Sequence, residues 1–170
     1  MPDVPSSFDH FVTEHGEALS RLARVLSPTR PDAEDLLQEA LLAIYRRWDR
    51  VGRADNVGAY ARRVLINEFL MATRRSRASQ APVVRLDRHT NGPGEDDVDS
   101  YDFARRTLAG LQPKQQAVLA LRYLDDLGDE DIARVMGCRR STVRSLAKRG
   151  LDNLRRQLDQ PAPSGKGYIR

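Results

Sequence analysis

The segment over residues 76–100 constrains the fold most, because it cannot contribute to a packed core. It begins Ser-Arg-Ala-Ser-Gln-Ala-Pro, contains Thr-Asn-Gly-Pro-Gly, and ends in the acidic run Glu-Asp-Asp-Val-Asp-Ser. Proline, glycine and clustered like charges leave too little apolar surface to offset the conformational entropy that ordering would cost. We therefore predict a flexible linker over residues 78–101, with one folded domain on each side of it.

The domain before the linker, over residues 5–77, is predicted to be a three- or four-helix bundle. Pro28 and Pro31 are expected to end its first helix, and Asp32 to cap the second. Leu and Ala outnumber Val and Ile in the chain, which also favours helices over strands. The apolar residues recur at helical spacing in three groups: Phe8, Phe11, Val12, Leu19, Leu22 and Leu26, then Leu37, Leu41, Ile44 and Trp48, then Val57, Tyr60, Ala61, Val64 and Leu65.

The domain after the linker, over residues 102–158, has the pattern of a helix-turn-helix. A short helix is predicted from Asp129 to Met136, and Gly137 can adopt the left-handed conformation that ends it. A last, basic helix is predicted from about Arg140 to Leu158. Helix, glycine turn and basic helix in this order are typical of DNA-binding domains. Residues 159–170 are expected to be a disordered tail, so the predicted fold class is all-α with two small helical domains. The predicted inner face of the last helix comprises Val143, Leu146, Leu151, Leu154 and Leu158.

The start of the last helix carries the strongest signal for DNA binding. Residues 139–149 contain five cations and no acid, and Arg140, Arg144 and Lys148 share one face of a helix. Such a helix fits the major groove, where Arg, Lys and Ser contact base edges or phosphates. A solvated surface helix is the alternative, but the glycine turn and the lack of acids within the run favour DNA. The predicted contacts are Arg139, Arg140, Ser141, Thr142, Arg144, Ser145, Lys148 and Arg149.

An acidic surface is predicted at the start of the second helix, where residues 32–39 read Asp-Ala-Glu-Asp-Leu-Leu-Gln-Glu. Carboxylates in the first turn of a helix interact favourably with its dipole, which accounts for Asp32 and Asp35. The dipole does not account for Gln38 and Glu39, one turn further on. We therefore predict a docking surface for a basic protein partner, formed by Asp32, Asp35, Leu36, Gln38 and Glu39.

A second basic surface is predicted on the third helix. Only Glu68 opposes the five arginines that lie between residues 62 and 77. Arginines suit contacts with a nucleic-acid backbone, and an asparagine among them can hydrogen-bond an exposed base. Ordinary exposed arginines are the competing interpretation, and a second basic surface in the same chain favours nucleic acid. The predicted contacts are Arg62, Arg63, Asn67, Arg74 and Arg75.

In their order along the chain, these motifs resemble the sigma factors of bacterial RNA polymerase. The similarity is to the small, two-domain extracytoplasmic-function (ECF) type, and among these to the sigma-E-like group of actinobacteria. Residues 32–39 resemble the segment that binds the clamp helices of the polymerase's largest subunit. Residues 59–67 (Ala-Tyr-Ala-Arg-Arg-Val-Leu-Ile-Asn), followed by Arg74 and Arg75, resemble the segment that reads and melts the minus-ten promoter element. Residues 111–123 resemble the opening of the fourth conserved region, and residues 131–145 its helix-turn-helix, which reads the minus-thirty-five element.

The resemblance implies a protein without enzymatic activity that binds core RNA polymerase, at the clamp helices and the flap, and directs promoter recognition and DNA melting in transcription initiation. It implies that Asn67 contacts a flipped-out base, and that an anti-sigma factor is a candidate further partner. Two departures affect these roles. Arg139 and Arg140 stand where the family often has a small capping residue and an apolar one. Residues 50–55 lack an aromatic side chain that could form one wall of a base pocket.

No catalytic residue, metal site, cofactor or membrane partner is predicted. The single cysteine and three histidines lack the spacing of a metal site, and phosphate-loop and hydrolase motifs are absent. Since there is neither a bilayer-length apolar run nor a secretory signal, we expect a cytoplasmic protein. Two alternatives remain open: a free-standing helix-turn-helix regulator that binds operator DNA as a dimer, and a carboxylate-metal nuclease built on Asp32, Asp35 and Glu39.

Overall fold

The computed structural model of the chain describes residues 7–79 and 95–160, with side chains in the second range from Ser100 onward. All regular secondary structure in these ranges is helical, which confirms the predicted all-α class. None of these helices is both long and apolar enough to cross a membrane. The helices are α1 (Phe8–Leu26), α2 (Arg30–Tyr45), α3 (Trp48–Val51), α4 (Val57–Ala78), α5 (Glu95–Leu108), α6 (Pro113–Tyr123), α7 (Asp129–Met136) and α8 (Arg140–Asp159).

The linker and tail predicted from sequence fall largely outside the described residues. Helix α5 begins at Glu95, within the segment assigned to the linker. Residues 80–94 and the tail beyond residue 160 are not described. What the structure describes is therefore two helical halves, α1–α4 and α5–α8.

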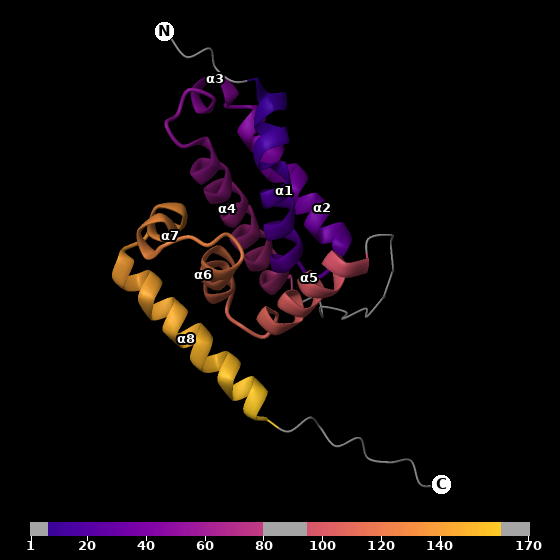
Figure 1. Cartoon of the computed structure of the whole chain (residues 1–170), viewed down its shortest axis with the longest axis vertical. Helices are drawn as coiled ribbons and strands as arrows, with labels where there is room; N and C mark the ends of the chain where they lie inside the picture. The colour runs from indigo at the N-terminus through magenta and orange to yellow at the C-terminus, as the bar shows by residue number, and fades with distance from the viewer. Residues whose placement is uncertain (1–6, 80–94, 161–170) are drawn as a thin grey trace.

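In the first half, α1 and α4 each pack against α2, and the short α3 lies at the end of the bundle near the N-terminus (Figure 1). The three long helices are preceded by the N-cap residues Ser7, Thr29 and Asn56, whose side chains each accept a hydrogen bond from the backbone N–H three residues further on. These bonds satisfy donors that the first turn of a helix leaves free. Local sequence therefore fixes where each long helix of this half starts.

The start and the inner face of α2 differ from the prediction. Thr29, not Asp32, is the N-cap residue. Pro31 lies in the first turn of α2 instead of ending α1, because a missing N–H costs no hydrogen bond there. Of the predicted stripe, Ile44 is fully buried, and Leu37, Leu41 and Trp48 are partly buried against the core. The prediction missed Leu36 and the small residues Ala33 and Ala40, which are also buried. The buried residues of α2 are Ala33, Leu36, Ala40 and Ile44.

In the second half, α7 spans the residues predicted for it and ends at Gly137, whose φ of 62° and ψ of 38° are left-handed. The N–H groups of Gly137 and Cys138 donate to carbonyls in the last turn of α7 at 3.4 and 3.0 Å. This Schellman motif requires a residue that adopts the left-handed conformation without strain, and glycine does so. The glycine turn predicted from the sequence is thus confirmed, and it sets the direction in which α8 leaves α7.

Helix α8 packs against α6 and α7 through Val143, Ala147 and Gly150, which are all buried. A Cβ atom at Gly150 would lie 3.0 Å from Leu119 Cδ1 of α6, so the absence of a side chain there permits the close contact. Leu158 was predicted to face inward but is 79% exposed. The last turn of α8 extends beyond the other helices in the view of Figure 1.

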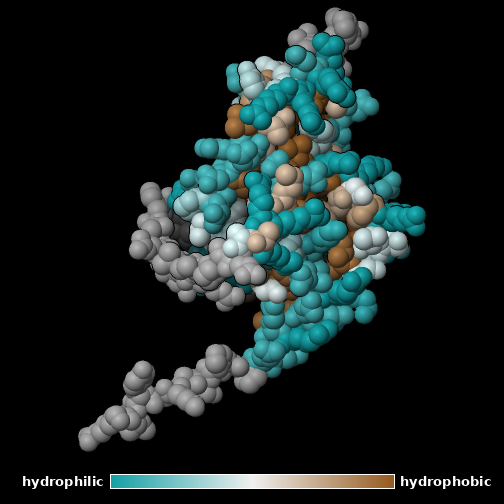
Figure 2. Space-filling model, turned by 180° about the vertical axis from the view of Figure 1, so that it is seen from behind, coloured by the Kyte–Doolittle hydropathy of each residue, from teal (hydrophilic) through white to brown (hydrophobic). Residues whose placement is uncertain are grey.

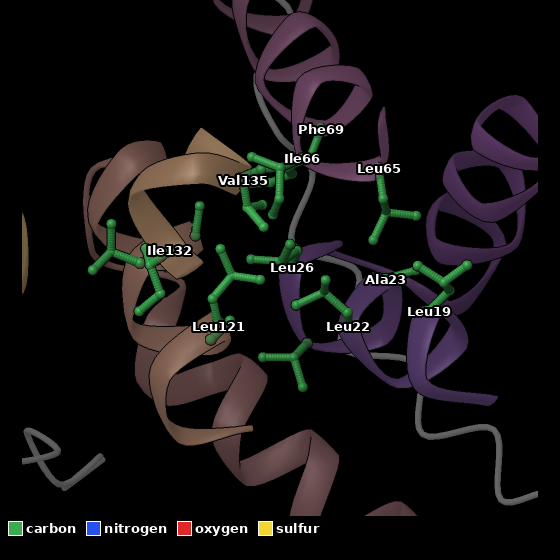
Figure 3. Close-up of a cluster of buried hydrophobic side chains, with 14 of the residues drawn as sticks. Leu19, Leu22, Ala23, Leu26, Leu65, Ile66, Phe69, Leu121, Ile132 and Val135 are labelled. Atoms are coloured by element: carbon green, nitrogen blue, oxygen red, sulfur yellow. The ribbon is translucent and has the colours of Figure 1, made fainter. Parts of the chain in front are cut away.

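One hydrophobic core runs through both halves of the molecule. Side chains of α1 and α4 meet side chains of α6 and α7, as Figure 3 shows. Each of these side chains is at most 4% exposed, and burial of a side chain of this size stabilises a fold by roughly 1.5–3 kcal/mol. The two halves therefore pack on each other instead of lying apart. The residues that meet are Leu22, Leu26, Ile66, Phe69, Leu121, Ile132 and Val135.

A buried ion pair joins the halves at the same interface. Arg62 of α4 donates through Nε to Oδ2 of Asp125, in the loop between α6 and α7, at 2.6 Å. The side chain of Asp125 is 2% exposed and that of Arg62 is 21% exposed. At the rim, Arg77 Nη2 donates to Gln112 Oε1 at 3.2 Å. Since a buried carboxylate without a partner is costly, Asp125 depends on Arg62 for its place in the fold.

Candidate functional site

The basic surface of α8 stands clear of the core. Buried Val143 and Ala147 hold one side of the helix against α6 and α7, so the residues between them face outward. Hydrophilic side chains predominate on the face of the molecule seen in Figure 2, where hydrophobic ones form only small, separate areas. An exposed cationic helix of this kind fits a major groove. All eight predicted contacts are exposed: Arg139, Arg140, Ser141, Thr142, Arg144, Ser145, Lys148 and Arg149.

Two of these cations nevertheless pair with acids that lie outside the basic run. Arg144 donates through Nε to Asp129 Oδ2 of α7 at 3.0 Å, and Lys148 donates through Nζ to Asp152 Oδ2 at 3.3 Å. Arg122 of α6 donates through Nη2 to the other oxygen of Asp129. These side chains line an open groove of about 370 Å³ beside α8. Residues 139–149 contain no acid, but acids from other parts of the chain pair with two of their cations. The charge environment of the helix could therefore not be predicted from this run alone.

The carboxylate of Asp129 is the centre of this cluster. Its side chain is 23% exposed, and both oxygens accept hydrogen bonds. The hydrogen bond from Arg144 is the main cause that lowers the pKa of Asp129, and the charge of Arg122 lowers it further, against the raising effect of partial burial. A lowered carboxyl pKa contributes stability that is present above the ordinary pKa and is lost as the pH falls through the lowered one. Asp129 is therefore ionised at neutral pH.

The predicted nucleic-acid surface of α4 is divided by the packing of the two halves. Asn67, Arg74 and Arg75 are exposed. Arg63 is also exposed, but its guanidinium lies beside the turn of the second half, where a Cβ atom at Gly137 would be 3.5 Å from Arg63 Nη2. Arg62 is held by the buried Asp125. The structure thus leaves four of the five predicted residues accessible.

The predicted acidic surface of α2 is exposed apart from one residue. Gln38 and Glu39 face solvent, and so does Asp35. Leu36 is 8% exposed and belongs to the core, so its predicted place on the docking surface is wrong. Asp32 is exposed but Oδ2 accepts a hydrogen bond from Thr29 Oγ1 at 2.6 Å, which gives it a role at the start of the helix. Next to these polar groups, Leu42 is 48% and Tyr45 60% exposed.

The carboxylates of α2 do not meet other ligands in a metal site. Across residues 7–79 and 95–160, no group of three or more His, Cys, Asp or Glu side chains is placed to hold a metal ion. Cys138 is unpaired in the turn before α8, and partial burial raises the pKa of its thiol. The geometry therefore gives the nuclease alternative no support in the described part of the chain.

Comparison with protein families matches two segments of the chain. The family model Sigma-70 region 2 matches residues 11–79, and the model Sigma-70, region 4 matches residues 104–154. The first segment contains the surfaces of α2 and α4, and the second contains the helix-turn-helix. The two models therefore cover every candidate surface described above, and neither is that of a free-standing regulator.

Whole-chain relatives agree with these matches. The RNA polymerase sigma-E factor of Streptomyces avermitilis is 35% identical over 153 residues, which cover 89% of this chain and 85% of the relative. The corresponding protein of Streptomyces coelicolor is 33% identical over the same shares of both chains. The ECF RNA polymerase sigma factor SigM of Mycobacterium tuberculosis is 29% identical, over 89% of this chain and 77% of its own.

Solved structures share the arrangement of helices. The sigma factor RpoE from Bartonella quintana, crystallised with the anti-sigma factor NepR, aligns with a TM-score of 0.72 at 26% identity, over 90% of this chain and 98% of that one. CnrH in complex with the cytosolic domain of CnrY aligns with a TM-score of 0.66 at 21% identity, over 91% and 89% of the two chains. Because both alignments span the two halves, the fold shared with these proteins includes α1–α4 and α5–α8.

Proposed function

This chain belongs to the ECF sigma factors of bacterial RNA polymerase, and from this membership we propose how its surfaces divide the work of transcription initiation. The chain binds core RNA polymerase and directs it to promoters. The observation that carries the proposal is the presence, in one chain, of region 2 with an exposed acidic surface and of region 4 with an exposed basic helix. The polymerase supplies the chemistry, and this protein is not an enzyme. Its place of action is then the cytoplasm, where the polymerase works.

The proposed division follows the two halves of the chain. Residues 5–77 form the domain that binds polymerase and the downstream promoter element, and residues 102–158 the domain that binds the upstream element and the flap. Asp35, Gln38 and Glu39 are the proposed polar contacts with the clamp helices, since all three are exposed on α2. The exposed Leu42 and Tyr45 add apolar area beside them. The linker predicted over residues 78–101 is proposed to let one chain reach both elements through the part of it that precedes α5.

On α4, the proposed contacts with the non-template strand are Arg63, Asn67, Arg74 and Arg75, which are accessible. Cations that track a single strand provide affinity through its phosphates, and Asn67 can hydrogen-bond an extruded base. Arg62 can reach DNA only after it leaves Asp125. Its proposed role therefore requires that the loop between α6 and α7 separates from α4 when the promoter is bound.

An anti-sigma factor is the proposed antagonist of this protein. The similar sigma factor from Bartonella quintana was crystallised in complex with one, and the alignment with it spans both halves of this chain. A protein that binds the two halves in their packed arrangement would hold Arg62 against Asp125. The chain would then be kept from using its α4 surface on DNA.

The general proposal is tested by run-off transcription from genomic fragments with purified core polymerase. The full chain should add transcripts that start at defined sites, because core polymerase alone does not recognise promoters. An unchanged set of transcripts would contradict the proposal. Tight binding of a palindromic duplex by the protein alone would instead favour a dimeric regulator.

Substitution of Arg144 by alanine should weaken binding of the upstream element by about 1–3 kcal/mol and relax the base preference at one position. The measurement is footprinting of the holoenzyme on its promoter. The matched control is Arg134→Ala on α7, since Arg134 is an exposed arginine that pairs with Glu130 and lies outside the basic run. An upstream footprint that is identical for the native chain and Arg144→Ala would remove α8 from the DNA interface.

Substitution of Asn67 by alanine should slow promoter opening more than it weakens the closed complex. Extrusion of a base costs a few kcal/mol, and loss of one contact with that base is expected to lower the opening rate by about tenfold. Permanganate reactivity of unpaired thymines measures opening, and a gel shift at low temperature measures the closed complex. Ser76→Ala, an exposed position on the same helix, is the control. Equal losses in both assays would assign Asn67 to general DNA binding.

A further inference from the structure

Asp129 controls which edge of the Arg144 guanidinium is free. A guanidinium carries five N–H donors in one plane, one on Nε and two on each Nη. Arg144 uses Nε for Asp129, and its side chain remains 64% exposed. The two Nη groups at the far end of the side chain are thus the donors left for an external ligand.

Arg122 fixes the carboxylate to which Arg144 is bound. Arg122 of α6 holds one oxygen of Asp129 and Arg144 of α8 the other, so the carboxylate cannot turn away from either. Asp129 is the first residue of α7, where the helix dipole favours a negative charge. Three helices therefore meet at a single carboxylate, which orients a side chain on the proposed DNA-reading helix.

We propose that Asp129 is a positioning residue that presents Arg144 end-on to a guanine in the major groove. This inference rests on the proposed role of α8. Guanine offers N7 and O6 as two acceptors for parallel N–H donors, whereas adenine offers one acceptor and one donor. With Nε occupied, only the Nη edge of Arg144 can make this bidentate contact. A guanidinium that is held in advance loses less conformational entropy on binding, which sharpens discrimination.

The charge of Asp129 gives this role a distinctive signature. A carboxylate close to DNA repels phosphates, so Asp129 lowers the sequence-independent part of the affinity. Removal of Asp129 should therefore raise binding to unrelated duplex while it lowers the preference for guanine. If Asp129 only supported the fold, its removal would lower both quantities together.

The test uses the full chain with core polymerase and, as probe, a pool of duplex DNA randomised across the upstream element. The base pair read by Arg144 is the one whose guanine preference is lost in Arg144→Ala. In Asp129→Ala, the preference at this base pair should fall about tenfold, while affinity for an unrelated duplex rises about twofold. Asp129→Asn keeps the shape and one acceptor, so it should retain part of the preference.

Asp152→Ala is the matched control. It removes one negative charge from the same groove but leaves the pair of Arg144 and Asp129 intact, because Asp152 pairs with Lys148. It should raise binding to unrelated duplex and leave the guanine preference unchanged. A native preference in Asp129→Ala, or an equal loss at every base pair, would overturn the positioning role. If Arg144→Ala changes no base pair, the proposed function of α8 fails instead, so the two failures are distinguishable.

Discussion

Replacement of Arg62 by alanine is expected to lower the free energy of unfolding by about 3–5 kcal/mol, which is a large part of the stability of a domain of this size. The reason is the carboxylate of Asp125, which is 2% exposed and has Arg62 as its ion-pair partner at 2.6 Å. Loss of the guanidinium leaves a buried charge without compensation. Urea denaturation followed by circular dichroism measures the effect.

The loss of stability in Arg62→Ala has an upper limit, because the two halves can separate and expose Asp125 to water. A variant that reaches this limit should show a larger radius of gyration in solution scattering before it unfolds. The control is Arg53→Ala, an exposed arginine, for which the change should lie within about 0.5 kcal/mol. The double variant Arg62→Met/Asp125→Leu should recover most of the stability, since apolar residues can replace a buried ion pair. A loss below about 1 kcal/mol in Arg62→Ala would show that water already reaches the pair.

Combined replacement of Gln38 and Glu39 by alanine is expected to weaken association with core RNA polymerase by about tenfold or more. If these two residues are among the few that contribute most of the binding energy, each truncation costs about 1 kcal/mol or more, and a combined loss of about 1.4 kcal/mol corresponds to a factor of ten. Both side chains are exposed on α2 and lie beyond its first turn, so the fold does not require them. Pull-down of core enzyme at increasing salt measures the association.

Glu34→Ala is the control for this variant, because Glu34 is an exposed acid on the same helix. It pairs with Arg30, one helical turn earlier, at 3.3 Å. The control should bind core enzyme like the native chain, and circular dichroism should show the same helix content in all three proteins. If the double variant binds core enzyme as well as the native chain does, the acidic residues of α2 serve only to stabilise the start of the helix.

Local features of the fold could be predicted from sequence. The end of α7 follows from the glycine at 137, because a residue in the left-handed conformation ends a helix. The basic surface of α8 follows from the charges of residues 139–149, which stay exposed since Val143 and Ala147 face inward. Such features depend on neighbours within one or two helical turns, and the sequence displays those neighbours directly.

Features that depend on packing between helices could not be predicted in the same way. Asp125 lies 63 positions from Arg62, and Asp129 lies 15 from Arg144. Neither acid belongs to the run of residues that it neutralises. Likewise, Leu26 has the spacing of a bundle residue in α1, but it also packs in the core that the second half completes. Periodicity shows that such a side chain is buried and leaves open which helix buries it.

The core that spans both halves sets a condition on when this protein can act. Ile66 and Phe69 on one side and Leu121 and Val135 on the other shield each other from water. Separation of the two halves in a free molecule would expose these apolar side chains to water, at a large cost in free energy. The free protein should therefore keep its two halves packed together, so that protein in excess over polymerase does not occupy promoter DNA. In a molecule bound to core RNA polymerase, contacts with the polymerase replace those between the halves, so the halves separate at a low cost in free energy.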